Sequence, residues 1–311
     1  MQPTLLTSSR KGEDILTDAI EPESRSTARE NEVGVRCIRL DDLLDKPLYR
    51  IFPLWSFEDM LRVRRLVLVP PSFWEDPLED IPSSIMMEGP NHQQKHLAEY
   101  LHPAFCQCWS FESESDSLLR AYSRVTIDKL HKRNVEPQYE GVQVRTTPRR
   151  LAQALIPWAT RSHGGQLYLG RVDYADTERA TSIITNTLAR VGPYEMARGE
   201  NRAQSLLLKR TAFSHEDEAR LIWVGSDRRH MDSPMTANVD PNDFIDEVRF
   251  DPRLVSFERI EREDRAKTLG YKGKFSDSLL YQRIFLQTIL PWNWDEWENG
   301  GQPNPPKPPT Q

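Results

Sequence analysis

The segment Leu206–Gly225, LLLKRTAFSHEDEARLIWVG, contains the most informative change of pattern in the chain. It begins apolar, becomes polar and charged through Ser214–Glu218, and ends in the apolar run Ala219–Val224. This second run is short, contains β-branched and aromatic residues, and stops at Gly225. The pattern therefore predicts a buried β-strand rather than a helix.

Two glutamates, Glu216 and Glu218, stand two residues apart at the start of this strand, and Arg220 follows at the same spacing. Since side chains alternate between the two faces of a strand, all three are expected on one face. Such a row is typical of a solvated strand edge. It is equally what a carboxylate pair at the lip of a cleft would need, one group orienting and one stabilising positive charge in a transition state.

The composition indicates an ordinary globular protein that is long enough to bury a core. The chain has 311 residues, of which 38% are hydrophobic and 28% charged, with a net charge of −6. The negative charge argues against a whole-surface nucleic-acid binder but leaves a local basic groove possible. No apolar run reaches membrane-spanning length. The three cysteines, an odd number without a secretory signal, predict reduced thiols in the cytoplasm.

The patterns along the chain predict one α+β domain over residues 33–295. Residues 1–32 lack apolar periodicity and are expected to form a flexible arm, and residues 296–311 a Pro-rich tail. The predicted strands are an edge strand in Val33–Leu40, then Leu48–Phe52, Ala104–Ser110, Gly141–Val144, Leu167–Tyr174 and Phe244–Phe250. The predicted helices are His92–Tyr100, one starting at Thr147-Pro148, one capped by Asp176, and Ser276–Leu290.

Three sets of residues invite other kinds of site. A zinc site would use the H-x3-H and C-x-C spacings within His92, His96, His102, Cys106 and Cys108, although His102-Pro103 interrupts the pattern. We therefore expect no metal there. A phosphate-binding face would use the following arginines, unless they are simply solvated: Arg62, Arg64, Arg65, Arg145, Arg149 and Arg150.

A metal-dependent nuclease is a further alternative. It would gather Glu75, Asp76, Glu79 and Asp80 with Glu216 and Glu218 around Mg²⁺. Glycine-rich dinucleotide and P-loop motifs, the G-x-S-x-G elbow and H-E-x-x-H are all missing from the sequence. Their absence disfavours the common dinucleotide folds, P-loop enzymes, serine hydrolases and zincins.

Several segments, taken in order, resemble a bacterial family known as domain of unknown function 2971. They cover roughly Leu48–Leu290 and are Leu48-Tyr49-Arg50, Pro71–Glu79, Cys108-Trp109-Ser110, Gly141–Val144, Lys209 ahead of Glu216-x-Glu218-x-Arg220, and Phe244–Val248 with Asp251-Pro252. One departure is visible, because the family usually has a tryptophan and a histidine before the position of Tyr122. Here Leu119-Arg120-Ala121 stand there instead.

The family's pattern in turn resembles that of ADP-ribosyltransferases. The resemblance implies a split, mostly antiparallel β-sheet with flanking helices. It also implies three site elements in chain order, whose nearest matches are Arg50, Ser110 and Glu218, with Glu216 as the preceding acid. Tyr49 and Tyr122 join Arg50 and Ser110 as expected contacts of NAD, the substrate that the resemblance implies.

The chemistry of NAD cleavage suits these residue types. Breaking the nicotinamide–ribose bond builds an oxocarbenium-like ribose, which a fixed carboxylate such as Glu218 stabilises. Arg50 would hold a phosphate or ribose oxygen, and Ser110 would fix a neighbouring strand or the nicotinamide amide. Glu216 would act on the acceptor nucleophile.

Two functions from different classes follow besides the nuclease. The first is an NAD-consuming ADP-ribosyltransferase acting on a protein or nucleic acid; the resemblance implies a toxin or phage-defence effector, with an antitoxin or regulatory partner and no membrane partner. The second is a non-catalytic interaction protein whose acidic row and tails recruit a partner.

Overall fold

The computed structural model of the protein describes residues 35–161, 164–226, 233–282 and 287–288. The chain divides into two compact units, Met1–Leu280 and Tyr281–Gln311, and all the helices and strands described below belong to the first. The predicted N-terminal arm and Pro-rich tail lie outside the described residues. None of the described helices is both long and apolar enough to cross a membrane.

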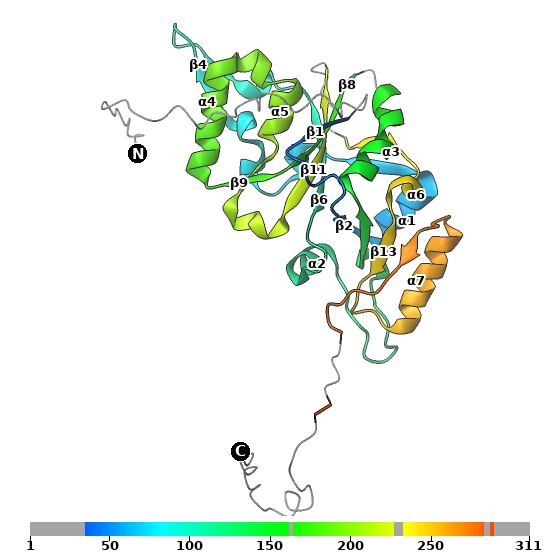
Figure 1. Ribbon diagram of the computed structural model, residues 1–311. Coiled ribbons are helices and arrows are strands. Elements are labelled where there is room, and N and C mark those ends of the chain that lie inside the picture. The colour runs from blue at the N-terminus through cyan, green and yellow to red at the C-terminus, as the bar shows by residue number, and fades with distance from the viewer. Residues whose placement is uncertain (1–34, 162–163, 227–232, 283–286, 289–311) are drawn as a thin grey trace, which may run out of the picture. The chain divides into compact units, whose positions relative to one another are not determined.

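In the described part of the chain, eight strands form one mostly antiparallel sheet (Figure 1). Its first four strands in spatial order are β1 (Val35–Ile38), β8 (Gly165–Arg171), β11 (Glu218–Gly225) and β6 (Ala104–Ser110). Its second four are β2 (Leu48–Pro53), β7 (Gly141–Thr146), β13 (Glu247–Phe250) and β14 (Lys274–Phe275). Only the outer pairs β1–β8 and β13–β14 are parallel.

The two groups of four strands are joined at a single point. Strands β11 and β6 pair along seven residues, and β2 and β7 along six. Between β6 and β2, however, the only pair is Tyr49 opposite Ser110. Beyond it the strands separate, and the free side of β6 instead bridges to Val69 through Cys106. The sheet is therefore split next to Arg50, the residue that follows Tyr49.

The organising strand β11 is buried at every position, as its apolar pattern predicts. Its alternate side chains serve two cores on the two faces of the sheet. Leu221 belongs to the core that includes Leu151 of α3 (Pro148–Arg161), whereas Ile222 belongs to the core that includes Ala203 of α5 (Gly199–Ser205). Burial on both faces explains why this run lacks the polar alternation of a surface strand.

The remaining elements surround this sheet. The other helices are α1 (Leu54–Val63), α2 (Asp116–Tyr122), α4 (Thr177–Met196), α6 (Pro241–Phe244) and α7 (Ser256–Thr268). Two-stranded sheets pair β10 (Leu208–Arg210) with β9 (Asp173–Ala175), β12 (Met235–Asn238) with β3 (Arg65–Leu68), and β4 (Met86–Glu88) with β5 (Gln94–His96). Short 3₁₀ turns are η1 (Pro71–Phe73), η2 (Pro77–Ser84), η3 (Leu97–Glu99), η4 (Pro137–Tyr139) and η5 (Thr211–Glu216).

Most of the predicted elements are confirmed. The structure has strands at Leu48–Pro53, Ala104–Ser110 and Gly141–Thr146, and β1 lies at the sheet edge as expected. The helix starts are also confirmed, because Thr147 Oγ1 accepts from the backbone N–H of Arg150 (3.2 Å) and Asp176 Oδ1 from that of Arg179 (2.8 Å).

Three predicted elements are wrong. His92–Tyr100 is not a helix, because Gln94–His96 pair as a hairpin with Met86–Glu88 and Leu97–Glu99 then form a 3₁₀ turn. Phe244–Phe250 is not one strand, since α6 ends at Phe244 and β13 begins at Glu247. The helix predicted for Ser276–Leu290 does not form over Ser276–Leu280, where the side chain of Glu114 accepts hydrogen bonds from Ser278 and the backbone of Leu279.

Candidate active site

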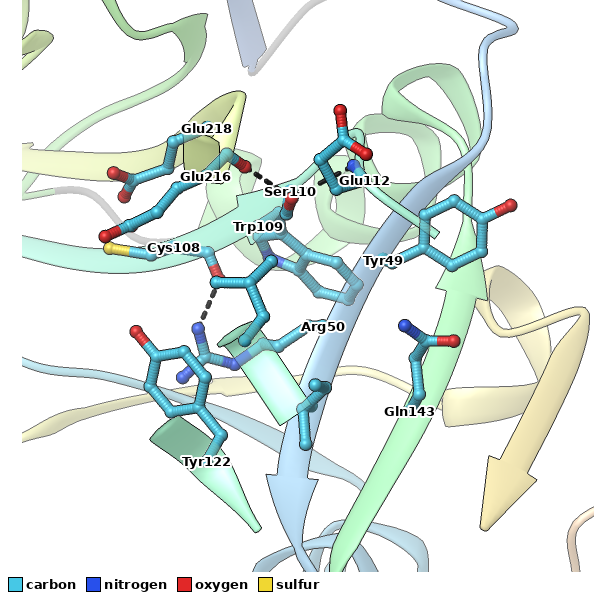
Figure 2. A pocket seen from close by; sticks show the side chains of 12 residues that line it. Tyr49, Arg50, Cys108, Trp109, Ser110, Glu112, Tyr122, Gln143, Glu216 and Glu218 are labelled. Atoms are coloured by element: carbon cyan, nitrogen blue, oxygen red, sulfur yellow. Dashed lines mark hydrogen bonds between the residues drawn. The ribbon is translucent and has the colours of Figure 1, made fainter. Parts of the chain in front are cut away.

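One pocket lies where the two halves of the sheet separate (Figure 2). About 460 Å³ of it is not filled by atoms, and part of this space is open to solvent. The lining of the pocket includes all six residues that were predicted for the NAD site: Tyr49, Arg50, Ser110, Tyr122, Glu216 and Glu218.

Arg50 lies one residue beyond the last pair that joins β2 to β6. Its guanidinium reaches across the gap between the strands, and Nη1 donates to the backbone carbonyl of Cys108. Nε is buried and has no hydrogen-bond partner. Among the residues that the structure describes, no carboxylate forms an ion pair with Arg50. Burial lowers the pKa of this arginine, yet a guanidinium remains charged in proteins. The pocket therefore contains a cation with N–H donors that are available to a ligand.

Ser110 holds the turn that precedes β11. Its hydroxyl donates to the backbone carbonyl of Glu216 and accepts from the backbone N–H of Glu112 (3.0 Å). One residue on, the backbone N–H of Phe111 donates to the carbonyl of Asp217 (2.8 Å). Because its proton is already engaged, Ser110 acts here on the protein backbone. The role predicted for Ser110 in the site stays a prediction.

Glu218 lines the pocket but is only 2% exposed and is held by buried cations. Its Oε1 accepts from Arg220 Nε (2.9 Å), and its Oε2 accepts from Lys209 Nζ (3.1 Å) and Arg220 Nη2 (3.1 Å). Burial alone would raise the pKa of Glu218, but Arg220 and Lys209 outweigh it and hold the pKa at about 2. Glu218 is thus a permanent carboxylate at neutral pH.

Glu216 lines the same pocket, but its backbone conformation differs from the predicted strand. It is the last residue of η5 and not part of a regular strand, because Asp217 adopts a left-handed backbone conformation with φ 38°. Lys209 then brings the two carboxylates together, since its Nζ donates to Glu216 Oε2 (2.8 Å) as well as to Glu218. Figure 2 shows both side chains extending in the same direction from the turn.

Three further residues, Glu79, Lys209 and Arg220, complete this ion cluster. Glu79 contributes a third carboxylate, which pairs with Arg220 and lies 3.7 Å from Lys209 Nζ. Burial raises the pKa of Glu79. Arg220 is fully buried, and its guanidinium lies 4.3 Å from the centre of the Trp74 ring. Lys209 and Arg220 stood within the quoted motif, and the nuclease alternative grouped Glu79 with Glu216 and Glu218 around a metal ion. In the structure, Lys209 and Arg220 contact Glu79 instead.

The two predicted tyrosines border the pocket in different ways. Tyr49 is 8% exposed, with the Arg249 guanidinium 5.8 Å from its ring centre, and it belongs to the pair that joins the half-sheets. Tyr122 is the last residue of α2 and is 52% exposed. Tyr49 is therefore a fixed wall of the pocket, and Tyr122 offers an exposed aromatic ring at its mouth.

Five of the six acids proposed for a metal-dependent nuclease, all except Glu75, form ion pairs with cationic side chains in the described part of the chain. Asp76 pairs with Arg210 (2.9 Å), Asp80 with Arg202, and Glu79 and Glu218 with Arg220. Among the described residues, no group of three or more His, Cys, Asp or Glu side chains is arranged to hold a metal ion. Carboxylates already neutralised by guanidinium groups are poor ligands for Mg²⁺.

The arginines considered for a phosphate-binding face are also ion-paired. Their carboxylate partners are Glu58 and Asp59 for Arg62, Asp240 for Arg64, Asp59 for Arg65, Asp246 for Arg145 and Arg150, and Asp45 for Arg149. Arg62, Arg64 and Arg65 are solvent-exposed, whereas the pair of Arg145 with Asp246 is half-buried, and the pairs lie on several elements. They match the alternative interpretation, solvated faces.

The chain matches no protein-family model and no curated protein. Among solved structures it is similar to DarT from Thermus sp. 2.9 in complex with NAD⁺, at 12% identity and a TM-score of 0.30, over 75% of this chain and 94% of that one. DarT in complex with ADP-ribosylated single-stranded DNA gives 12% identity and a TM-score of 0.29, over 74% and 92% of the two chains. TM-scores this low do not establish a shared fold.

Proposed function

We propose that this chain is an ADP-ribosyltransferase that consumes NAD and transfers ADP-ribose to a protein or a nucleic acid. The observation that carries the proposal is the charge pattern of the pocket. Arg50, a cation without a carboxylate partner among the described residues, shares the pocket with two adjacent carboxylates, Glu216 and Glu218. A ligand that carries both a negative and a positive group would satisfy both.

NAD has this charge distribution, with a negative pyrophosphate and a positively charged nicotinamide ring. With all five groups ionised, Glu79, Glu216 and Glu218 outnumber Lys209 and Arg220 by one negative charge. That net charge favours a cationic ring and the positive ribose that forms as the ring leaves. Arg50 would hold a phosphate or ribose oxygen through charge-assisted hydrogen bonds.

The proposed reaction breaks the bond between the ribose C1′ and the nicotinamide nitrogen. The electron pair of that bond leaves with the ring as neutral nicotinamide, and the ribose becomes oxocarbenium-like. The acceptor nucleophile then bonds to C1′, and its proton passes to a pocket carboxylate or to water. Ser110 would keep the Glu216 turn in place, and Tyr49 and Tyr122 would enclose the ligand.

The biological setting is part of the same proposal. A toxin or phage-defence effector needs a substrate that every cell contains, and NAD meets that requirement. Such a chain would act together with an antitoxin or another regulatory protein. The complexes of Thermus DarT name NAD⁺ and ADP-ribosylated DNA for that protein, and the proposal here depends on the pocket itself.

The test is incubation of the purified chain with NAD labelled in the adenosine part, alone and with a cell lysate. We expect nicotinamide release and a labelled macromolecule, which protease or nuclease treatment would assign to protein or nucleic acid. Arg50→Gln should lower the rate by about 10- to 100-fold, the value of a charged hydrogen bond. The exposed Arg62→Gln is the matched control and should leave it unchanged.

Absence of both nicotinamide release and labelling would contradict the proposal. Degradation of nucleic acid that EDTA stops and NAD does not affect would favour the nuclease instead. A cellular phenotype that survives Arg50→Gln but requires the terminal segments would favour the interaction protein.

A further inference from the structure

We infer that Glu216 is the carboxylate that faces the substrate, and that Lys209 is a positioning residue that fixes the Glu216 side chain there, while Glu218 holds Lys209 in place. This inference rests on the proposed function and reverses the roles that the family resemblance implies, in which Glu218 would act on the ribose. It follows from which carboxylate oxygens the protein itself already uses.

Glu218 has little capacity left for a ligand. Both of its oxygens accept hydrogen bonds from Arg220, and Oε2 also accepts from Lys209. Its side chain is 2% exposed, and Arg220 behind it is fully buried. A carboxylate that is ion-paired with two cations attracts a positively charged ribose less strongly than a carboxylate that is ion-paired with one cation. If the Glu218 side chain turned toward a ligand, Nε of the buried Arg220 would lose its hydrogen-bond partner.

Glu216 is in the opposite situation. Its side chain is 16% exposed, and only Oε2 is engaged, by Lys209 at 2.8 Å. Within the described part of the chain, Oε1 accepts no hydrogen bond, and the residue lines the pocket. Glu216 can therefore offer one oxygen to a ligand without breaking any contact of the protein.

The backbone around Glu216 is fixed from three sides. The Ser110 hydroxyl donates to the Glu216 carbonyl, and the hydroxyl of Tyr174 accepts from the backbone N–H of Glu218 (2.9 Å). Arg171 pairs with the side chain of Asp217 at 2.9 Å. A turn restrained in this way presents the Glu216 side chain in one orientation, which electrostatic stabilisation of a transition state requires.

Lys209 acts on the substrate only through Glu216. Its three donors face three carboxylates, those of Glu216 (2.8 Å), Glu218 (3.1 Å) and Glu79 (3.7 Å), and its side chain is 7% exposed. Burial opposes the charged form, but Glu218 and Glu216 raise the pKa of Lys209 above its ordinary value. Without this cation, Glu216 and Glu218 would repel each other and Glu216 would lose its anchor.

The experiment compares nicotinamide release, NAD affinity and thermal unfolding in five variants. Glu216→Gln should lower kcat by about 100- to 1,000-fold, as removal of one stabilising group does in other enzymes. Its KM should change by less than about threefold and its melting temperature should not fall. Lys209→Met should also lower kcat more than KM, and Lys209→Arg should restore most of the loss because it keeps a cation beside both carboxylates. Glu218→Gln should lower the melting temperature. Glu178→Gln, an exposed change on α4, is the control.

Three results would overturn the inference. The first is a wild-type kcat for Glu216→Gln in a chain that turns over NAD. The second is a Glu218→Gln variant that melts like the wild type and loses more of kcat than Glu216→Gln does. The third is Lys209→Arg no more active than Lys209→Met. A wild-type chain that releases no nicotinamide would instead overturn the proposed function, and this inference with it.

Discussion

At the scale of single residues, two charges that line the pocket have opposite surroundings. Arg50 has one hydrogen bond, to a backbone carbonyl, and a buried Nε without a partner. Glu218 has more cationic donors than it needs. A partly buried charge without an ion-pair partner is unfavourable, and an anionic group of a ligand would satisfy it. The charge of Arg50 is thus the clearest sign of function in this molecule.

The ion pair of Glu218 predicts a specific dependence of stability on pH. Its pKa is lowered from 4.5 in the unfolded chain to about 2 in the fold, so its contribution is present above about pH 4.5 and is lost as the pH falls toward 2. A shift of this size corresponds to about 3 kcal/mol. The difference in unfolding free energy between wild type and Glu218→Gln should shrink by about this amount from pH 6 to pH 2.

Urea denaturation of both proteins across that pH range measures the difference directly. Because the two proteins share every other titrating group, the groups outside the ion cluster of Glu218 cancel in this difference. A difference that stays constant with pH would mean that Glu218 is not held by Arg220 and Lys209 in solution.

A short sequence motif predicts which residues line a site, but it often does not predict which side chains form ion pairs with them. Arg50, Ser110 and Glu218 were identified through family resemblance, and all three line the pocket. The pairing of Glu218 with Arg220 is local, two residues apart. The link from Arg220 to Glu79 spans 141 residues and depends on how η2 packs, so no local pattern reveals it.

At the scale of elements, the pocket exists because two strands stop pairing after one residue. If β2 continued along β6, the backbone groups of both strands would be used in the sheet and no gap would form. The separation leaves the Cys108 carbonyl for Arg50, and the turn before β11 completes the other wall. The apolar pattern predicted the strands β2, β6 and β11. The register in which strands distant in sequence pair with each other cannot be predicted from the sequence of one strand.

The turn between η5 and β11 gives a test at this scale. Asp217 has a left-handed backbone, with φ 38°, that is costly for β-branched residues. Asp217→Val should therefore lower stability by roughly 1–3 kcal/mol and slow NAD turnover by displacing Glu216. Asp217→Gly relieves the backbone and loses only half-exposed ion pairs, which are worth about 0–1 kcal/mol. Denaturant unfolding and nicotinamide release of the two variants measure both effects, and equal stabilities would contradict this description of the turn.

At the scale of the whole molecule, the split sheet has four strands on each side of the pocket, so a ligand bound there should stabilise the fold. A ligand present at 100 times its Kd adds about 2.7 kcal/mol to the stability of the state that binds it. We expect a non-hydrolysable NAD analogue to raise the melting temperature by several degrees. Arg50→Gln should lose most of this shift, and Arg62→Gln should keep it. An equal shift in wild type and Arg50→Gln would place the analogue elsewhere.

The α+β class could be predicted from the patterns of strands and helices, whereas the split, mostly antiparallel sheet was predicted through the family resemblance. The hairpin at β4–β5 could not, because His92–Tyr100 carries helix-forming residues whose pairing with Met86–Glu88 is decided by the turn between them. The same reason applies at α6, where Asp240 caps a single helical turn that includes Phe244, the first residue of the predicted strand. Local propensity decides such short segments less than tertiary contacts do.

The location of the ligand is the central claim, and a crystal structure of the chain with a non-hydrolysable NAD analogue tests it most directly. We predict a phosphate or ribose oxygen of the analogue within hydrogen-bonding distance of Arg50, with the nicotinamide ribose beside the unengaged oxygen of Glu216. An analogue bound away from this pocket at saturating concentration, with Arg50 contacting only Cys108, would contradict the account.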